Sequence, residues 1–414
     1  MVFDKLFRTL VTLEEAKKTL FEHYEAKPIG IENIRISEAY GRTAAQDIKA
    51  PIDVPPFDRS TVDGYAVRAE DTFGASELKP ITLKLVDSVR AGEWPKTIIR
   101  AKEAVRLSTG APIPKGGNAV IMLEHTALRE MEVAAYGSVT PSQNILPRGL
   151  DVQKNQTIVK AGLVIGLREI GMLSAVGLGE VEVYRRPRVA VLSTGREIVA
   201  PGLRLMSGEV YDINMSTLST SIAMCGAVSV PIGILKDEPN ELKRAVLRAR
   251  EESDVAVSSG ATSAGPEDIL PKVLNEVGRP GVIVHGISMK PGKPTAIAVL
   301  NGKPFFALPG HPTSALITFH LLVKPVLAQM IGLKTEIGER VKAKAFTKIL
   351  KEREALSFVA VSLDRDELGE FVAKPIKRES GALTTFIEAD GFVEIPSMKQ
   401  LIEKGEKVTV HKIL

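Results

Sequence analysis

The stretch that decides the fold is Val255-Ala-Val-Ser-Ser-Gly-Ala-Thr-Ser-Ala-Gly-Pro-Glu-Asp268. Its apolar run ends in small hydroxyl and glycine residues and is followed by a proline and two acids. This order predicts a buried strand, a tight turn and a helix. Open α/β sheets build anion pockets in this way, because the N–H groups of the turn and of the helix start point at one place.

Two later stretches carry related chemistry. Met289-Lys-Pro-Gly-Lys-Pro-Thr295 adds two lysines, and Phe306-Ala-Leu-Pro-Gly-His-Pro-Thr-Ser-Ala-Leu316 is a second apolar run that ends in a glycine turn. Lysines and small residues suit an anion. Glu267 and Asp268 would repel a bare anion, but they fit a divalent cation that bridges carboxylates to phosphate oxygens.

Strand and helix patterns alternate from Arg188 onward. Val189-Ala-Val-Leu-Ser-Thr-Gly195 is a continuous apolar run, typical of a strand buried on both faces. Repeated β–α units predict a mainly parallel sheet with right-handed crossovers. The turns at Gly195, Gly260 and Gly310 then share the carboxyl edge, where such sheets bind ligands.

Four acids accompany these turns: Glu197, Asp212, Asp237 and Asp268. Each acid alone is explained as a partner of a helix dipole. Four acids on one edge beside lysines are harder to explain in that way, so we expect a ligand site there. Asn214 is predicted to cap the helix that follows Asp212.

The N-terminal part opens with a capping box, Thr12-Leu-Glu-Glu15. Pro56-Phe-Asp-Arg-Ser-Thr-Val-Asp-Gly-Tyr-Ala-Val67 reads either as a proline-stiffened connector with a hairpin turn at Asp63-Gly64 or as a site loop. Short strands between about 70 and 140 predict a small β domain. Trp94 is explained equally by packing and by stacking on a flat ring. Arg148 and Asp151 are expected to form a surface pair.

Size and charge exclude several classes of protein. The chain has 414 residues, of which 44% are hydrophobic and 25% charged, which fits a globular protein of roughly three domains. A net charge of +4 is too small to indicate nucleic-acid binding. The single cysteine, Cys225, excludes an internal disulfide. No run approaches the roughly 20 apolar residues of a membrane span, so we expect a cytoplasmic protein.

Taken together, the motifs resemble the MoeA family, the molybdopterin molybdotransferases that include the gephyrin E domain. The similar segments are Ser259–Asp268, Lys290-Pro-Gly-Lys-Pro294, Leu308–Ala315, Pro56–Val67, Arg106-Leu-Ser-Thr-Gly-Ala-Pro112 and Ser193-Thr-Gly-Arg-Glu197. The chain departs from the usual pattern at four positions: Ala261, His311, Arg196 and Glu352.

The resemblance implies a multidomain α/β and β protein with a central, mainly parallel α/β domain, a small β insertion and a C-terminal small β-barrel. The expected domains are an elongated N-terminal subdomain at 1–50 plus 141–180, an inserted β subdomain at 51–140, a MogA-like molybdopterin-binding α/β domain at 185–331, and the barrel at 335–414. The segment after Gly332 is rich in lysine and has strand-like patterns, which agrees with a barrel or a sandwich.

It also implies an activity: insertion of molybdate, or tungstate, into adenylylated molybdopterin, with release of AMP and dependence on Mg²⁺. The implied catalytic residues are Asp58, Asp63, Glu197, Asp237 and Asp268, of which the last three would bind the metal. The implied substrate-binding residues are Ser60, Thr109, Asp151, Ser193, Thr194, Gly195, Asp212, Ser259, Gly260, Ser263, Lys290, Lys293, Pro309, Gly310, Pro312, Ser314, Arg353 and Ser380.

The implied partners are a second copy of the chain in a homodimer, a MogA/MoaB-type adenylyltransferase and molybdoenzyme acceptors. Two other functions are weighed beside this one. A MogA-type adenylyltransferase would normally consist of the α/β domain alone. A non-catalytic molybdopterin-binding scaffold would be expected to carry further domains.

Overall fold

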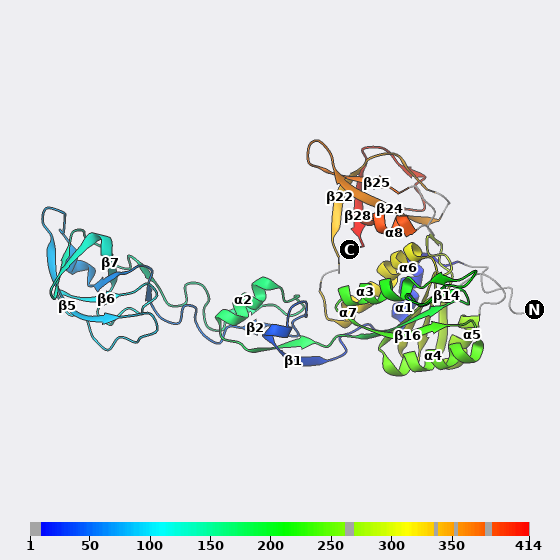
Figure 1. Ribbon diagram of the computed structural model, residues 1–414, viewed down its shortest axis with the longest axis horizontal. Helices are drawn as coiled ribbons and strands as arrows, with labels where there is room; N and C mark the ends of the chain where they lie inside the picture. The colour runs from blue at the N-terminus through cyan, green and yellow to red at the C-terminus, as the bar shows by residue number, and fades with distance from the viewer. Residues whose placement is uncertain (1–9, 261–268, 335–337, 352–354, 377–382, 414) are drawn as a thin grey trace, which may run out of the picture.

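The computed structural model describes residues 10–260, 269–334, 338–351, 355–376 and 383–413. Figure 1 shows an elongated molecule. A β-rich body with β5, β6 and β7 lies at one end, and the α/β sheet with its helices lies at the other, beside the C-terminal strands. A slender middle part that contains β1, β2 and α2 joins the two ends.

The β-rich body is a six-stranded sheet with the order β7-β4-β6-β5-β9-β8. Its strands are β4 (Gly64–Val67), β5 (Ile81–Val89), β6 (Glu103–Leu107), β7 (Ala119–Met122), β8 (Thr126–Arg129) and β9 (Glu132–Ala135). Tyr65 and Val67 face one apolar cluster and Ala66 faces another, as the two-residue repeat of a strand requires. This sheet agrees with the predicted β domain.

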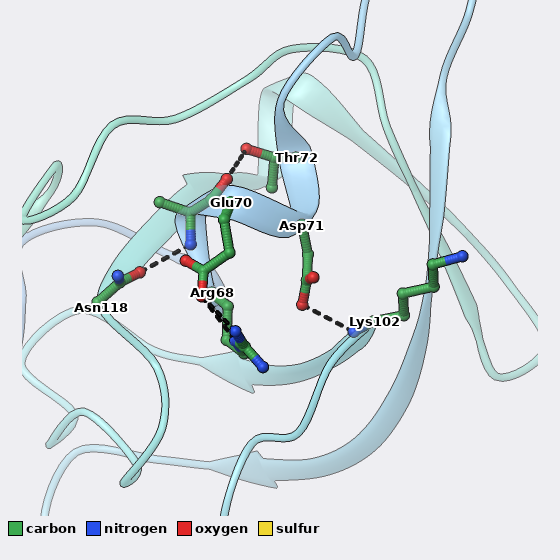
Figure 2. Close-up of polar contacts among 7 residues, drawn as sticks. Arg68, Glu70, Asp71, Thr72, Lys102 and Asn118 are labelled. Carbon is green, nitrogen blue, oxygen red and sulfur yellow. Dashed lines mark hydrogen bonds and ion pairs between the residues drawn. The ribbon is translucent and has the colours of Figure 1, made fainter.

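Two acidic residues of this body, Glu70 and Asp71, make structural contacts. Figure 2 shows the short helix η3 (Ala69–Thr72) with Glu70 paired to Arg68 through Nε at 2.8 Å. Asp71 accepts the backbone N–H of Lys102 at 2.7 Å. These carboxylates hold the η3 turn against neighbouring segments and are not candidates for chemistry.

In the middle part the outgoing chain pairs with the returning chain. The antiparallel pairs are β1 (Ile31–Arg35) with β12 (Glu180–Tyr184), β2 (Ile48–Lys49) with β11 (Thr157–Val159), and β3 (Arg59–Ser60) with β10 (Ile145–Leu146). Helix α2 (Leu167–Ala175) packs beside them. The β body therefore lies between the outgoing and the returning segment of this part. The division of the chain into domains stays a prediction.

The α/β sheet has six strands in the order β16-β13-β17-β21-β20-β18. The strands are β13 (Arg188–Thr194), β16 (Val228–Leu235), β17 (Val255–Ser259), β18 (Pro280–His285), β20 (Ala296–Leu300) and β21 (Lys303–Leu308). Four neighbours, β16, β13, β17 and β21, run parallel, and β20 is antiparallel to both of its neighbours. The sheet is mainly parallel, as predicted.

Helices cover both faces of this sheet. They are α1 (Leu13–His23), α3 (Asn214–Met224), α4 (Pro239–Glu252), α5 (Ile269–Val277), α6 (Pro312–Thr318), the π-helix η5 (Phe319–Val323) and α7 (Lys324–Met330). Val189 and Val191 join the apolar cluster under α1, α3, α6 and α7, whereas Ala190 and Leu192 join the cluster under α4 and α5. The predicted capping box of α1 is present: Thr12 Oγ1 accepts the N–H of Glu15.

One expectation about this region is corrected. Among the described helices, the run Pro312–Met330 has the length (19 residues) and mean hydropathy (1.2) of a membrane span. This contradicts the expectation that no segment approaches such a length. However, 72% of the run is buried inside the protein, because Leu316, Phe319 and Val326 belong to the core of the α/β sheet.

The C-terminal strands close into a barrel in the order β24-β25-β22-β28-β26, because β26 pairs back with β24. Its strands are β22 (Arg340–Ala345), β24 (Leu356–Arg365), β25 (Phe371–Pro375), β26 (Gly391–Ile395) and β28 (Lys407–Lys412). The pair β23 (Ile349–Leu350) and β27 (Leu401–Ile402) and helix α8 (Leu383–Glu388) accompany it. The strand β19 (Met289–Lys290) of the α/β part pairs with β24 and ties the barrel to the sheet.

Candidate functional site

The carboxyl ends of three neighbouring strands come together in the α/β sheet. Ser193 of β13 lies opposite Ser259 of β17, and Ser259 lies opposite Leu308 of β21. The predicted residues Ser193, Thr194 and Ser259 therefore meet at one edge, and all three are buried. This confirms the expectation that the turns after these strands share an edge.

Glycines let the loops after these strands approach one another. Gly260 has a φ of +92°. A Cβ atom on Gly260 would lie 2.3 Å from the carbonyl oxygen of Thr194, so a side chain does not fit. A Cβ atom on Gly310 would lie 3.8 Å from the Gly260 Cα, which shows how closely these two loops pass. The N–H of Gly260 donates to the Leu308 carbonyl at 3.2 Å.

Asn214, which the sequence predicts as a helix cap, instead joins two loops at this edge. The Asn214 side-chain nitrogen Nδ2 donates to Ser259 Oγ and to the Gly310 carbonyl oxygen, both at 2.6 Å. Asn214 is the first residue of α3, not its cap, and it is buried. The N-cap residue is Ile213, and Asp212 just before it accepts the N–H of Met215 with its Oδ1 at 3.0 Å. In the sequence, the only indication of these roles is that Asp212 and Asn214 are polar residues two positions apart at the predicted start of the helix.

Carboxylates flank this edge in different environments. Glu197 is exposed and precedes β14 (Ile198–Val199), which pairs with β15 (Val210–Tyr211) next to Asp212. Asp212 is buried, and its Oδ2 has no hydrogen-bond partner among the described residues. Ser193 Oγ is likewise buried without such a partner. Asp237 is half-buried after the end of β16. Two unsatisfied buried oxygens at one strand edge are a reason to expect a bound ligand.

The two predicted lysines lie where the α/β sheet meets the barrel. Lys290 belongs to β19, opposite Ser357 of β24, and is half-buried, whereas Lys293 is exposed. The carbonyl of Lys293 accepts the N–H of Ile287 at 3.0 Å. Pro309 and Ser314 are buried around the loop into α6, Pro312 is half-buried and Gly310 is exposed.

A second group of predicted residues comes together in the β-rich body. The Oδ1 atom of Asp63 accepts the N–H of Thr109 at 2.9 Å, and the Ser60 carbonyl accepts the N–H of Gly110 at 2.8 Å. Asp58 Oδ1 accepts the N–H of Arg148 at 2.7 Å. The motifs around 56–67 and 106–112 thus form one surface, here called the Asp58–Thr109 surface. This surface belongs to the end of the molecule opposite the α/β edge (Figure 1).

One of the two interpretations of the 56–67 motif, the one with a hairpin turn, is wrong, and so is the Arg148–Asp151 pair. Asp63-Gly64 does not make a hairpin turn, because Gly64 begins β4, which pairs with β6 and β7, while β3 pairs with β10. Arg148 pairs with Asp53 at 2.6 Å and not with Asp151, because Asp53 also receives the Lys154 N–H and is held in place. Asp151 itself is exposed.

Several predicted residues lie outside the described part of the chain, namely Ser263, Asp268, Arg353 and Ser380. Among the residues that are described, no group of three or more His, Cys, Asp or Glu side chains is arranged to hold a metal ion. Glu197 and Asp237 alone therefore do not complete the predicted metal site. The third carboxylate of the prediction, Asp268, lies outside the described residues.

A cavity of about 850 Å³ lies elsewhere, between α1, α7 and the barrel. Leu13, Lys324, Arg340 and His411 are among its lining residues, and none of the predicted site residues is. Although the cavity is large, it therefore lacks the residues expected to bind the substrate. The strand edge is the better candidate, because it has buried oxygens without a described partner.

Three segments of the chain match known families. Residues 11–177 match the MoeA N-terminal region (domain I and II), residues 190–329 a probable molybdopterin binding domain, and residues 342–413 the MoeA C-terminal region (domain IV). A molybdopterin molybdenumtransferase of Haemophilus influenzae is 33% identical over 404 residues, which cover 97% of this chain and 98% of the relative. The chain belongs to the MoeA family.

Solved structures agree with this assignment. A molybdopterin biosynthesis MoeA protein from Pyrococcus horikoshii matches with a TM-score of 0.87 and 42% identity, covering 98% of this chain and 100% of that one. The molybdopterin molybdenumtransferase of Nostoc is 31% identical, covering 90% of this chain and 86% of the relative. This MoeA chain is accordingly a transferase of molybdenum cofactor biosynthesis.

Proposed function

We propose that this MoeA protein inserts molybdate into adenylylated molybdopterin and releases AMP. The observation that carries the proposal is the strand edge, where Ser193 Oγ and Asp212 Oδ2 are buried without a described partner beside two glycine turns. The Ser193 hydroxyl can donate to a phosphate oxygen, and the Asp212 carboxylate can meet a phosphate through a divalent cation that bridges the two. The printed name of the Haemophilus influenzae relative supports the reaction class.

The residues at this edge have distinct proposed roles. Thr194, Gly195, Ser259 and Gly260 bind the pyrophosphate, and Asn214 holds the Ser259 and Gly310 loops in place. In the reaction, the two dithiolene sulfurs bond to molybdenum, and one oxo group of molybdate leaves as water with the two thiol protons. A water molecule cleaves the pyrophosphate, and AMP leaves. No nucleophile from the protein is required, so the protein contributes positioning and electrostatic stabilisation.

Magnesium is the proposed cofactor, held by Glu197, Asp237 and Asp268. When bound, it would neutralise charge on the pyrophosphate and on the leaving AMP. The fit is partial within the described residues, because only the first two of these acids are among them. The unsatisfied Oδ2 of Asp212 is a further oxygen on the same edge.

The oxoanion would bind beside the pyrophosphate. Lys290 and Lys293 supply positive charge at the junction of sheet and barrel. The remaining proposed contacts are Pro309, Gly310, Pro312, Ser314, Arg353 and Ser380. Molybdate is the proposed substrate, and tungstate is the competitor that an experiment must include, because both are tetrahedral dianions.

A homodimer is proposed because the two groups of site residues lie at opposite ends of one elongated chain (Figure 1). A second copy would bring its Asp58–Thr109 surface, with Asp151, to the strand edge of the first. The adenylylated substrate would come from a MogA/MoaB-type adenylyltransferase, and the product would pass to molybdoenzymes in the cytoplasm.

The test is AMP release from adenylylated molybdopterin by the purified protein with Mg²⁺, in the presence and absence of molybdate or tungstate. Release that depends on the oxoanion supports the proposal. Pyrophosphate release from ATP and molybdopterin would identify an adenylyltransferase instead, and binding without turnover would identify a scaffold. Asp237→Asn should lower AMP release much more than substrate binding, and Glu251→Gln, at an exposed acid of α4, is the control.

A further inference from the structure

Trp94 is the only tryptophan of the chain, and its surroundings exclude one of its two interpretations. The sequence leaves packing and stacking on a flat ring equally open. In the structure the Trp94 side chain is 69% exposed, so it is not a core residue. Its indole meets the ring of Phe57 edge to face, with the ring centroids 5.6 Å apart and the planes at 86°.

A fixed turn holds this indole. Glu93 Oε2 accepts the N–H of Arg90 at 2.9 Å, and the Arg90 carbonyl accepts the N–H of Glu93 at 3.0 Å. Pro95 restricts the backbone on the other side of Trp94. An aromatic side chain has only two rotatable bonds, and here the turn and Phe57 already restrict them. It would therefore lose little conformational freedom when a ligand covers it.

The same turn lies against the Asp58–Thr109 surface. The carbonyl of Val89 accepts the N–H of Ser108 at 3.3 Å. A Cβ atom on Gly110 would lie 3.8 Å from the Ala91 Cβ. Phe57, which contacts Trp94, directly precedes Asp58. The indole therefore contacts the 56–67 motif through Phe57, and the turn that carries it contacts the 106–112 motif through Ser108.

The carboxylates of this surface indicate what kind of ring would lie on the indole. Asp58 and Asp63 are both exposed, and each uses its Oδ1 for a backbone N–H. A carboxylate only accepts hydrogen bonds, so its partner must offer N–H or O–H groups. Pterin and adenine are both flat heteroaromatic rings with amino groups on their edges.

We propose that Trp94, supported by Phe57, stacks on the heteroaromatic ring of the substrate, the pterin or the adenine. This inference rests on the proposed function, because the ring belongs to adenylylated molybdopterin. Trp94 acts as a positioning residue for one end of the substrate, while the strand edge of the other copy binds the pyrophosphate. Stacking of a ring on an aromatic side chain strengthens binding by roughly fivefold to a hundredfold.

The single tryptophan allows a direct test by fluorescence of the full-length protein. Saturable quenching of the indole by AMP, or by a free pterin, is expected, and the more effective ligand identifies the stacked ring. Free N-acetyltryptophanamide at the same absorbance corrects for light absorbed by the pterin. If the tryptophan emission changes with neither ligand, the proposal is overturned. Emission that shifts only when the protein is diluted also overturns it, because Trp94 would then contact the second copy.

Kinetics provide the second readout. Trp94→Ala should raise the KM for the adenylylated substrate by roughly fivefold to a hundredfold and leave kcat nearly unchanged. Trp94→Phe should restore most of the affinity. Phe73→Ala removes another exposed aromatic of the same body, 57% exposed, and should leave KM unchanged.

Failure of the proposed function and failure of the stacking proposal give different experimental results. A wild-type protein without AMP release dependent on molybdate or tungstate sinks the proposed function. An active wild type whose Trp94→Ala variant keeps the same KM sinks only the stacking.

Discussion

Acid should destabilise this protein through His320, a residue of the π-helix η5. The Nδ1 atom of His320 lies 3.1 Å from Lys324 Nζ and accepts a hydrogen bond from it, which requires a neutral imidazole. The ring also packs edge to face on Phe392, with the centroids 5.0 Å apart. Burial, and then the charges of Lys324, His411 and Arg340, lower the pKa of His320 from 6.5 to about 3.

The sign of the effect follows from proton binding. Below pH 6.5 the unfolded chain binds a proton at this histidine, whereas the folded protein binds it only near pH 3. Stability is therefore lost as the pH falls through this window. The lowered pKa implies a loss of roughly 2 kcal/mol between about pH 7 and about pH 5.

A variant separates the contribution of His320 from that of every other titrating group. His320→Gln keeps an acceptor for Lys324 but cannot be protonated. In urea unfolding, the wild type should lose about 2 kcal/mol more than the variant between about pH 7 and about pH 5. A histidine NMR signal assigned to His320 should not titrate near neutral pH. Equal losses for both proteins, or titration near 6.5, would refute the reasoning.

Three further predictions concern the ligand edge and the core. Gly260→Ala should lower both AMP release and the midpoint of thermal unfolding, because its Cβ would lie 2.3 Å from the Thr194 carbonyl oxygen. Gly302→Ala, at a φ of +85° with open space around it, is the matched control, and equal effects would contradict the steric argument. Asn214→Ala should destabilise the protein by about 1–3 kcal/mol in urea, because buried acceptors lose their donor; an unchanged unfolding curve would disprove this role. Cys225 should react with a thiol dye only after unfolding, because burial raises the pKa of its thiol to about 11, and rapid labelling of folded protein would argue against this.

Local patterns predicted the strands of the ligand edge well. The run from Val189 to Thr194 alternates between two cores, and an unbroken apolar sequence is what such a strand needs. The glycine turns after β13 and β17 were recognisable because only glycine tolerates their positive φ without strain. The reversed direction of β20 was not predicted, since strand direction depends on which neighbours the strand meets.

The role of a polar residue was harder to predict than its presence. Asp212 and Asn214 are two residues apart, and both are good helix caps, so the sequence offered no reason to choose between them. In the structure neither of them is the N-cap residue, which is Ile213; Asp212 accepts the N–H of Met215, and Asn214 donates to Ser259 and Gly310. These two partners are 45 and 96 residues away along the chain.

By itself the sequence determined the order of strands and turns, the β-rich excursion, the barrel and the family, because these depend on local periodicity and on motifs. Only the tertiary structure decided that Thr109 binds Asp63, that Asn214 joins two loops and that Trp94 stays exposed. Such contacts join distant parts of the chain. They form only after the sheets have brought those parts together.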